Sequence, residues 1–229
     1  MSSPAPAPPP PSPAHPAPPT PPPSRIAPAA PLSSAALAAQ TLVCGLLGGV
    51  SRLITHGLNT TVVVHGERFA AAHGGRGPGQ GLLTASNHVT AVDDPGIIAP
   101  LVPPAWLVSP ERLRWTLCAA DRCFTSAPLG ALLGAGRVLP VERGGGARQP
   151  HMDAVVARLA AGDWVHMFPE GARQWPPGQP LGRLRPGLGR LIADAHPTPL
   201  VVPLYHDGMQ VSAGRRGGRR KEGRMMECR

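Results

Sequence analysis

Five short apolar runs, separated by segments of helical periodicity, constrain the fold of this chain more than any other feature. The runs span residues 61–64, 82–86, 137–141, 164–168 and 200–205, and apolar helical patterns span 95–101, 151–161 and 188–195. Alternation of strand-like and helix-like segments is typical of α/β domains. We therefore expect an α/β fold with a mixed sheet flanked by helices.

The chain has room for one such domain. Its 229 residues, 42% of them hydrophobic, support a single core, which we expect within residues 60–210. Residues 1–31 are mostly proline, alanine and serine. That composition predicts either a disordered extension or a leader peptide, and both interpretations remain open. Residues 211–229 are predicted to form a basic tail without regular structure.

Residues 32–59 carry apolar side chains at the i, i+3, i+4, i+7 spacing of one helix face. The apolar positions are Val43, Leu46, Leu47, Val50, Ile54 and Leu58, whereas Gln40, Thr41, Ser51, Arg52 and Thr55 lie elsewhere around the helix. The strongly apolar stretch is shorter than the ~20 residues of a spanning helix. This favours an amphipathic helix at a membrane interface over a spanning helix, with a helix packed in the core of a soluble domain as the alternative.

The formal charge of +9 does not indicate a nucleic-acid partner. Residues 215–229 contain seven basic residues and two glutamates, so more than half of the net charge lies in the tail. Basic and aromatic residues do not interleave as they do in surfaces that stack nucleic-acid bases. We therefore expect no nucleic-acid binding.

The four cysteines are Cys44, Cys118, Cys123 and Cys228. Their spacing forms no C-x-x-C pair and no cysteine–histidine pattern typical of zinc sites. We expect buried free thiols, no disulfide framework and no metal site.

A histidine and an aspartate mark the end of the second apolar run. Asn87 and His88 follow the run directly, and Asp93 comes five residues after His88, just before Asp94 and Pro95. A turn between strand and helix can fold Asp93 onto the imidazole, which leaves the other ring nitrogen to act as a general base. Asp94 is then expected to be the N-cap of the following helix. Taken alone, this spacing also fits a structural pair.

Three further motifs end apolar runs. Residues 136–143 place Arg143 at a strand exit, and Phe168 begins the sequence F-P-E-G-A-R, with a Val-Pro pair at 202–203. Arginine suits phosphate, Glu170 can hold a hydroxyl, Gly171 allows close backbone approach, and Arg173 can pair with phosphate. A solvated arginine and a plain turn are the alternatives for the first two motifs.

In this order, the four motifs resemble the blocks of the glycerolipid acyltransferase superfamily. Several longer sequence segments make the chain similar to the tafazzins, the phospholipid–lysophospholipid transacylases of mitochondria. These segments are A-A-D-R-C-F-T at 119–125, G-D-W-V-H-M-F-P-E-G at 162–171, G-R-L-I-A at 189–193 and P-L-Y-H-D-G-M at 203–209. The resemblance covers about residues 42–209.

The resemblance implies acyl transfer between phospholipids without coenzyme A or another cofactor. His88 is the implied base and Asp93 its orienting carboxylate, while Arg143, Glu170 and Gly171 bind the glycerophosphate headgroup. The implied substrates are phosphatidylcholine and other phospholipids and lysophospholipids, with monolysocardiolipin as acceptor in cardiolipin remodelling. The implied location is the surface of the inner and outer mitochondrial membranes, facing the intermembrane space.

Two departures leave alternatives open. Ala172 and Arg173 stand where animal tafazzins tend to have lysine, and the resemblance ends at Met209. We therefore expect a C-terminally short acyltransferase domain. The alternatives to the transacylase are an acyl-CoA-dependent lysophospholipid acyltransferase and a catalytically inactive membrane-binding homologue.

Overall fold

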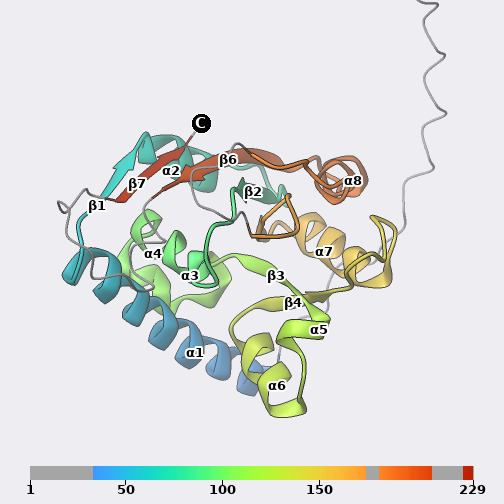
Figure 1. The fold of residues 1–229 in the computed structure, drawn as a ribbon, viewed down its shortest axis with the longest axis horizontal. Coiled ribbons are helices and arrows are strands. Elements are labelled where there is room, and N and C mark those ends of the chain that lie inside the picture. The colour runs from blue at the N-terminus through green and yellow to red at the C-terminus, as the bar shows by residue number, and fades with distance from the viewer. Residues whose placement is uncertain (1–32, 174–180, 208–223, 229) are drawn as a thin grey trace, which may run out of the picture.

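The structure is a computed structural model that describes residues 33–173, 181–207 and 224–228. The strands are β1 Thr61–Val64, β2 Leu82–Ser86, β3 Trp115–Ala119, β4 Val138–Val141, β5 Trp164–Met167, β6 Leu200–His206 and β7 Arg224–Cys228. They form one seven-stranded sheet in the order β1-β7-β6-β2-β5-β3-β4 (Figure 1). The strands from β6 to β4 run parallel, β7 runs antiparallel to β6, and β1 pairs parallel with β7. The predicted α/β fold with a mixed sheet is confirmed.

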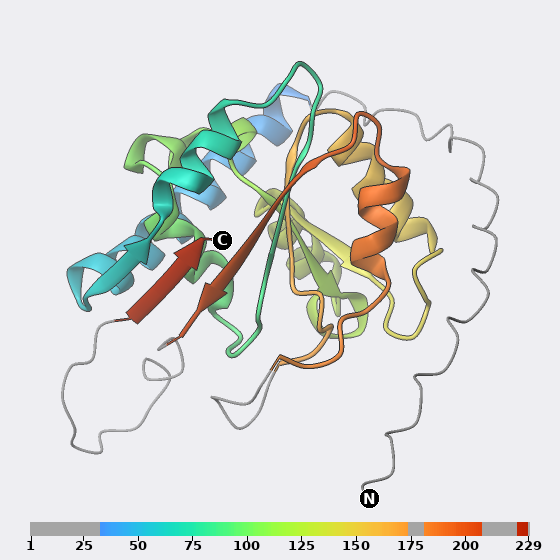
Figure 2. The same ribbon diagram turned by 90° about the horizontal axis from the view of Figure 1, so that it is seen from above.

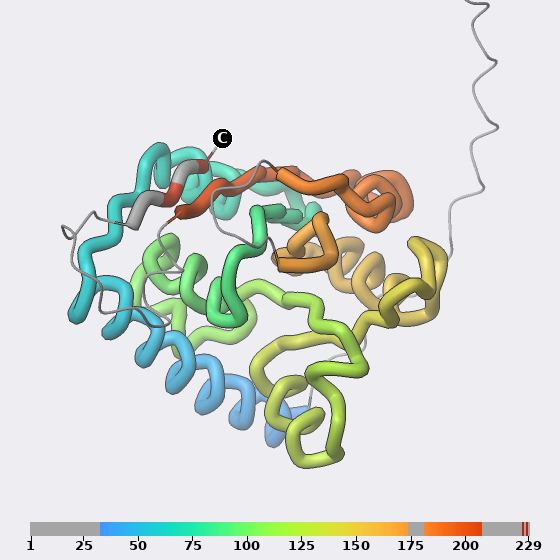
Figure 3. Tube along the Cα trace, in the orientation of Figure 1, coloured from blue at the N-terminus to red at the C-terminus, as the bar shows by residue number. Residues whose placement is uncertain are grey.

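Helices cover both faces of this sheet (Figure 2). The longer helices are α1 Ser34–Arg52, α2 Gly66–Gly74, α6 Ala127–Ala135, α7 Pro150–Ala160 and α8 Gly187–Asp194. Short ones are α3 Asp93–Gly96, α4 Ile98–Leu101, α5 Ala120–Cys123, the π-helix η1 Leu53–Gly57, and the 3₁₀ helices η2 Pro104–Val108 and η3 Pro110–Arg112. The course of the chain can be followed in Figure 3.

Successive residues of the central strands point to opposite faces of the sheet and pack in two separate hydrophobic clusters. On β2, Leu82 packs in the cluster on the side of α1 and α2, and Leu83 packs in the cluster on the side of α7 and α8. On β5, Trp164 and Val165 divide in the same way. A run that is buried on both faces is therefore continuously apolar rather than alternating, as expected for central parallel strands.

Helix α1 attaches to the domain through its polar and small residues. Gln40, Cys44 and Gly48 are its buried residues, and the Arg52 guanidinium donates hydrogen bonds to the carbonyls of Ala99 and Val102 at 2.9 and 3.0 Å. Most of its larger apolar side chains are exposed instead, namely Leu37, Leu42, Leu46, Leu47 and Val50. The continuous helix Ser34–Gly57 is long and apolar enough to cross a membrane by length and composition, and 17% of its most apolar window is buried.

Two expectations about the cysteines and the tail are wrong. Cys118 and Cys123 form a disulfide with a Cα–Cα distance of 6.0 Å, because α5 turns back over the end of β3. Cys44 is a buried free thiol, as expected, and Cys228 is buried and takes no part in this disulfide. Residues 224–228 of the predicted irregular tail form β7, because the backbone there pairs with both β1 and β6.

Candidate active site

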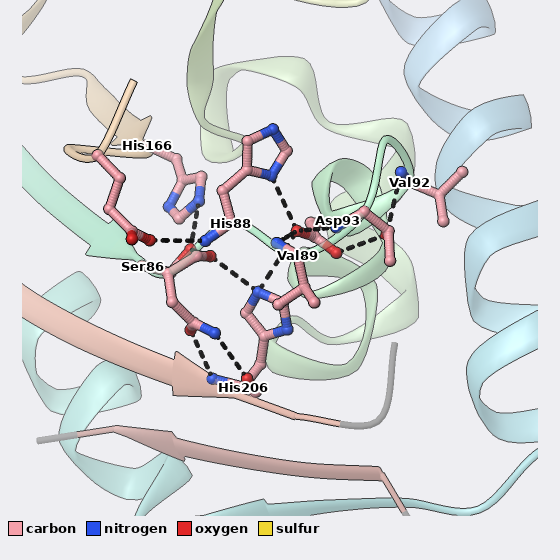
Figure 4. Close-up of polar contacts among 10 residues, drawn as sticks. Ser86, His88, Val89, Val92, Asp93, His166 and His206 are labelled. Atoms are coloured by element: carbon pink, nitrogen blue, oxygen red, sulfur yellow. Dashed lines mark hydrogen bonds and ion pairs between the residues drawn. The ribbon is translucent and has the colours of Figure 1, made fainter. Parts of the chain in front are cut away.

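The carboxyl ends of five parallel strands meet at one edge of the sheet, which is where α/β folds commonly place their sites. His88 lies just after β2, Glu170 follows β5, and His206 ends β6. The sheet order puts β2 between β6 and β5, so His206 and His88 come together (Figure 4), and Glu170 accepts a hydrogen bond from the His88 N–H.

His88 and Asp93 are in direct contact. The His88 Nδ1 atom lies 2.9 Å from Asp93 Oδ2. Since a carboxylate only accepts, Nδ1 carries the hydrogen and Nε2 is left as an acceptor. The Asp93 side chain is fully buried, whereas the His88 side chain is 21% exposed. In Figure 4 the other ring nitrogen of His88 points away from Asp93, so it is the atom that can meet a substrate.

The His88 ring is also held by an aromatic neighbour. It stacks on Phe168 with ring centroids 4.0 Å apart and an interplanar angle of 17°. Phe168 follows β5, the strand that pairs with β2. The imidazole is therefore fixed by a carboxylate at one nitrogen and by an apolar surface on one face.

Asp93 accepts several hydrogen bonds besides the one from His88. The N–H groups of Val89 and Thr90 donate to Oδ2 at 2.5 and 2.8 Å, and the Thr90 hydroxyl donates to Oδ1 at 2.6 Å. Burial raises the pKa of Asp93, but the His88 hydrogen bond, the charge of His206 and the Thr90 hydrogen bonds lower it more, so the pKa lies below its ordinary value. The carboxylate therefore stays ionised beside the imidazole.

Glu170 contacts the backbone of the base rather than open solvent. Its Oε1 accepts from the His88 N–H at 3.2 Å, and its Oε2 accepts from the Gly182 N–H at 2.8 Å. The next residue, Gly171, has a φ of +68°, which disfavours residues with a Cβ. The P-E-G turn thus brings a buried carboxylate to the backbone of His88, two residues after the end of β2.

The two predicted phosphate-binding arginines are both exposed. Arg143 follows β4, which is separated from β2 by β3 and β5, and its Nε lies 3.6 Å from Asp121 Oδ1. Its side chain is 55% exposed. Arg173 is exposed as well. Both remain available to a ligand, and neither is brought into contact with His88.

Asp94 does not cap the helix as predicted. The N-cap of α3 is Val92, without a side-chain hydrogen bond. Asp94 is buried and accepts hydrogen bonds from Nε and Nη2 of Arg114, the former at 2.8 Å. Burial raises the pKa of Asp94, but the charge of Arg114 lowers it more, so the pKa lies below its ordinary value. The ion pair with a residue twenty positions away overrides the local capping preference.

A buried polar chain beneath the site has no counterpart in the sequence predictions. Trp164 Nε1 donates to Thr84 Oγ1 at 2.9 Å, and Thr84 Oγ1 lies 2.8 Å from His166 Nδ1. His166 Nε2 lies 3.3 Å from Ser86 Oγ, which donates to the Asn87 carbonyl at 3.1 Å. Burial lowers the pKa of His166 to about 4, so this histidine is neutral at pH 7 and serves as a polar link.

The described part of the chain contains no group of three or more His, Cys, Asp or Glu residues placed to hold a metal ion. The contact of His88 Nδ1 with Asp93 leaves Nε2 able to accept a proton. The contacts of Thr90, Phe168, His166 and His206 were missed from the sequence. All four residues lie within or beside the recognised motifs, but no sequence pattern shows that they contact His88, Asp93 or the residues next to them.

Comparisons with known proteins identify the chain as a member of the acyltransferase family. Residues 61–207 match the family model described as Acyltransferase. N-acylphosphatidylethanolamine synthase of Arabidopsis thaliana is 38% identical over 138 residues, which are 59% of this chain and 47% of the relative. Tafazzin of Drosophila melanogaster is 32% identical over 167 residues, 73% of this chain and 43% of the relative. Tafazzin of Saccharomyces cerevisiae is 30% identical over 165 residues, 57% of this chain and 43% of the relative. The matched segments span less than half the length of these relatives.

Proposed function

Because this chain belongs to the acyltransferase family and is 30–32% identical to the two tafazzins over 57–73% of its length, we propose that it transfers acyl chains between phospholipids and lysophospholipids without coenzyme A. The proposed physiological reaction is the remodelling of cardiolipin acyl chains, with monolysocardiolipin as acceptor and phosphatidylcholine as a donor. The observation that carries the proposal is the His88 imidazole, held by a buried carboxylate at Nδ1 and open at Nε2.

The proposed reaction begins with the free hydroxyl of the lysophospholipid. His88 Nε2 takes the hydroxyl proton while the oxygen attacks the ester carbonyl of the donor, and Asp93 stabilises the imidazolium that forms. The tetrahedral intermediate then expels the oxygen of the donor glycerol. That oxygen takes the proton back from Nε2, so one ester is exchanged for another and His88 is regenerated. The exchange needs no cofactor, because the bond broken and the bond formed are alike.

The headgroup is proposed to lie along the carboxyl edge of the sheet. Arg143 and Arg173 are exposed cations that suit phosphate oxygens. Glu170 and Gly171 belong to the turn after β5, where Glu170 accepts from the His88 N–H, and their proposed role is to shape the backbone against the glycerol. Substrate binding by these four residues is part of the proposal.

The proposed location is the surface of mitochondrial membranes facing the intermembrane space, with α1 in the interface. The outward apolar side chains of α1 support this placement, because leucines in water gain free energy by entering lipid. The membrane surface and its phospholipids are thus the proposed partners.

The test is acyl transfer in liposomes that contain labelled phosphatidylcholine and monolysocardiolipin, without coenzyme A. We expect transfer by the parent chain and its loss by about 10²-fold or more in His88→Ala, because general-base catalysis contributes about that much. His151→Ala, which changes a partly exposed histidine of α7, is the matched control and should keep full activity. Liposome binding should be equal in all three proteins.

Two added arms separate the alternatives. If acyl-CoA is required for transfer, the chain is an acyl-CoA-dependent acyltransferase. The Arabidopsis relative is named for a product of phosphatidylethanolamine, so that lipid is offered as a second acceptor. Liposome binding without transfer under every condition would indicate an inactive membrane-binding homologue and would refute the proposed function.

A further inference from the structure

His206 is a buried histidine that the proposed reaction does not use. It is 2% exposed and ends β6, on the opposite side of Asp93 from the base. Its Nε2 lies 2.9 Å from the carbonyl oxygen of Asn87 and 3.7 Å from Asp93 Oδ2. Asn87 directly precedes His88, so His206 touches both the backbone before the base and the carboxylate that orients the base.

The contacts determine which ring nitrogen of His206 carries the hydrogen. A carbonyl oxygen only accepts, so the 2.9 Å contact requires an Nε2–H donor. The same edge of the ring then presents its positive hydrogen to the Asp93 carboxylate. The ring can therefore support two groups of the site at once.

The peptide group between Asn87 and His88 is held at both ends. Its carbonyl accepts from His206 Nε2 and from Ser86 Oγ at 2.9 and 3.1 Å, and its N–H donates to Glu170 at 3.2 Å. Fixing this peptide plane fixes the direction in which the His88 side chain leaves the backbone. Without His206, the plane loses one of its constraints and Asp93 loses a facing donor.

A separate pair of hydrogen bonds joins the strands independently of the His206 ring. The Asn87 side chain donates to the His206 carbonyl at 2.8 Å and accepts from the His206 N–H at 3.0 Å. These two contacts use only the backbone of His206. Substitution of its side chain therefore leaves the attachment of β6 to the end of β2 intact.

We infer that His206 is a positioning residue for the proposed reaction, which orients the His88–Asp93 pair through the Asn87 carbonyl and the Asp93 carboxylate. This inference rests on the proposed function, because the pair that it orients is the proposed catalytic one. It assigns to the end of β6 a role in the geometry of a base that lies 118 positions earlier in the chain.

The experiment replaces the ring with side chains that keep or remove the donor. In His206→Leu and His206→Asn, no donor reaches the Asn87 carbonyl, because leucine has none and the asparagine amide is too short. We expect kcat to fall about tenfold or more, within the ~10²–10⁴-fold that a general base supplies, with KM unchanged. His206→Gln places an amide N–H near the position of Nε2 and should restore most of kcat.

Proton NMR of the His88 Nδ1–H provides a readout that does not require activity. A hydrogen donated to a buried carboxylate resonates far downfield, and we expect the signal to shift or broaden in His206→Leu and His206→Asn but not in His206→Gln. Val202→Ala, a buried β6 position without polar contacts, controls for loss of stability and should keep both the signal and kcat.

Two results would overturn the inference. One is a parental kcat and an unchanged His88 signal in His206→Leu or in His206→Asn. The other is an equal loss of kcat in His206→Gln and His206→Leu, which would indicate that only ring volume matters. If the parent itself transfers no acyl chain, the proposed function fails, and the NMR signal still decides whether His206 positions His88.

Discussion

At the scale of single residues, Asp93 is the point on which the polar contacts of the site converge. It accepts from His88, from two backbone N–H groups and from the Thr90 hydroxyl, all within the turn that follows β2. A buried carboxylate with this many donors stabilises both the imidazole and the loop. The ionised Asp93 carboxylate therefore stabilises the fold and also takes part in the proposed mechanism.

This state predicts a dependence of stability on pH. Because the folded pKa of Asp93 lies below its ordinary value of 3.8, its contribution is present above about pH 4 and is lost as the pH falls through the folded pKa. Asp93→Asn should lower the free energy of unfolding at pH 7 and weaken its fall below about pH 4. Urea unfolding across this range measures both effects.

Asp94 shifts in the same direction, so part of the acid sensitivity should remain in Asp93→Asn. The control is Asp121→Asn, whose side chain is 58% exposed and should leave the pH dependence unchanged. An Asp93→Asn variant that loses stability with acid as steeply as the parent would contradict the assignment of this effect to Asp93.

At the scale of elements, α1 packs on the domain with polar and small residues and exposes its leucines, which is the reverse of what a helix on the surface of a soluble domain usually does. Its buried residues are Gln40, Cys44 and Gly48, while Leu42 and Leu46 are 73% and 66% exposed. A helix in the core of a soluble domain buries its leucines instead. The structure therefore differs from the core-packed alternative, and the exposed leucines define the face that we propose enters lipid.

The Leu42→Gln, Leu46→Gln double variant tests this face. Each leucine that enters lipid contributes about 1.5–3 kcal/mol, so affinity for liposomes should fall by about tenfold or more. The melting temperature should stay unchanged, since neither side chain is buried in the domain. Sedimentation with liposomes and thermal unfolding check the two expectations.

Val201→Gln is the matched control, because Val201 is 41% exposed on β6 and lies outside α1. It should bind liposomes as the parent does. Equal binding by the double variant and the parent would exclude the Leu42 face from the membrane contact.

At the scale of the whole molecule, β7 joins the ends of the described chain into one sheet. It lies between β1 and β6, and Met226 and Cys228 are buried in the same cluster as Phe69 of α2. The cluster therefore combines residues from both ends of the described chain. Disruption of this cluster should therefore lower the stability of the entire domain, because both ends of the described chain share it.

Met226→Asp should accordingly destabilise the whole protein. A carboxylate buried in an apolar cluster costs several kcal/mol, and for a domain of this size ~1 kcal/mol corresponds to about 2–4 °C in melting temperature. We expect one cooperative transition at a markedly lower temperature in differential scanning calorimetry. Val201→Asp, at an exposed position of β6, should change it little. A parental melting temperature in Met226→Asp would show that β7 does not contribute to the core.

The strands that were predicted from sequence share one property, which is a compact apolar run bounded by turn residues. Their observed bounds agree with the prediction to within about one residue, and α7 and α8 agree as closely. β3 was missed because Trp115–Ala119 follows Arg114 and shows no clear alternation. α6 was missed because Ala127–Ala135 is apolar around the whole helix, so it has no periodic face. β7 was missed because its partners are remote in sequence.

The sequence by itself determined the α/β alternation, the family and the His88–Asp93 contact, because these depend on local patterns or on five neighbouring residues in one turn. Only the tertiary structure decided the rest of the site. Asn87 meets His206, Glu170 meets the backbone of His88, and Asp94 meets Arg114 instead of capping a helix. The physical reason is the order β6-β2-β5, because hydrogen bonds between distant segments form only after the sheet has brought the strand ends together.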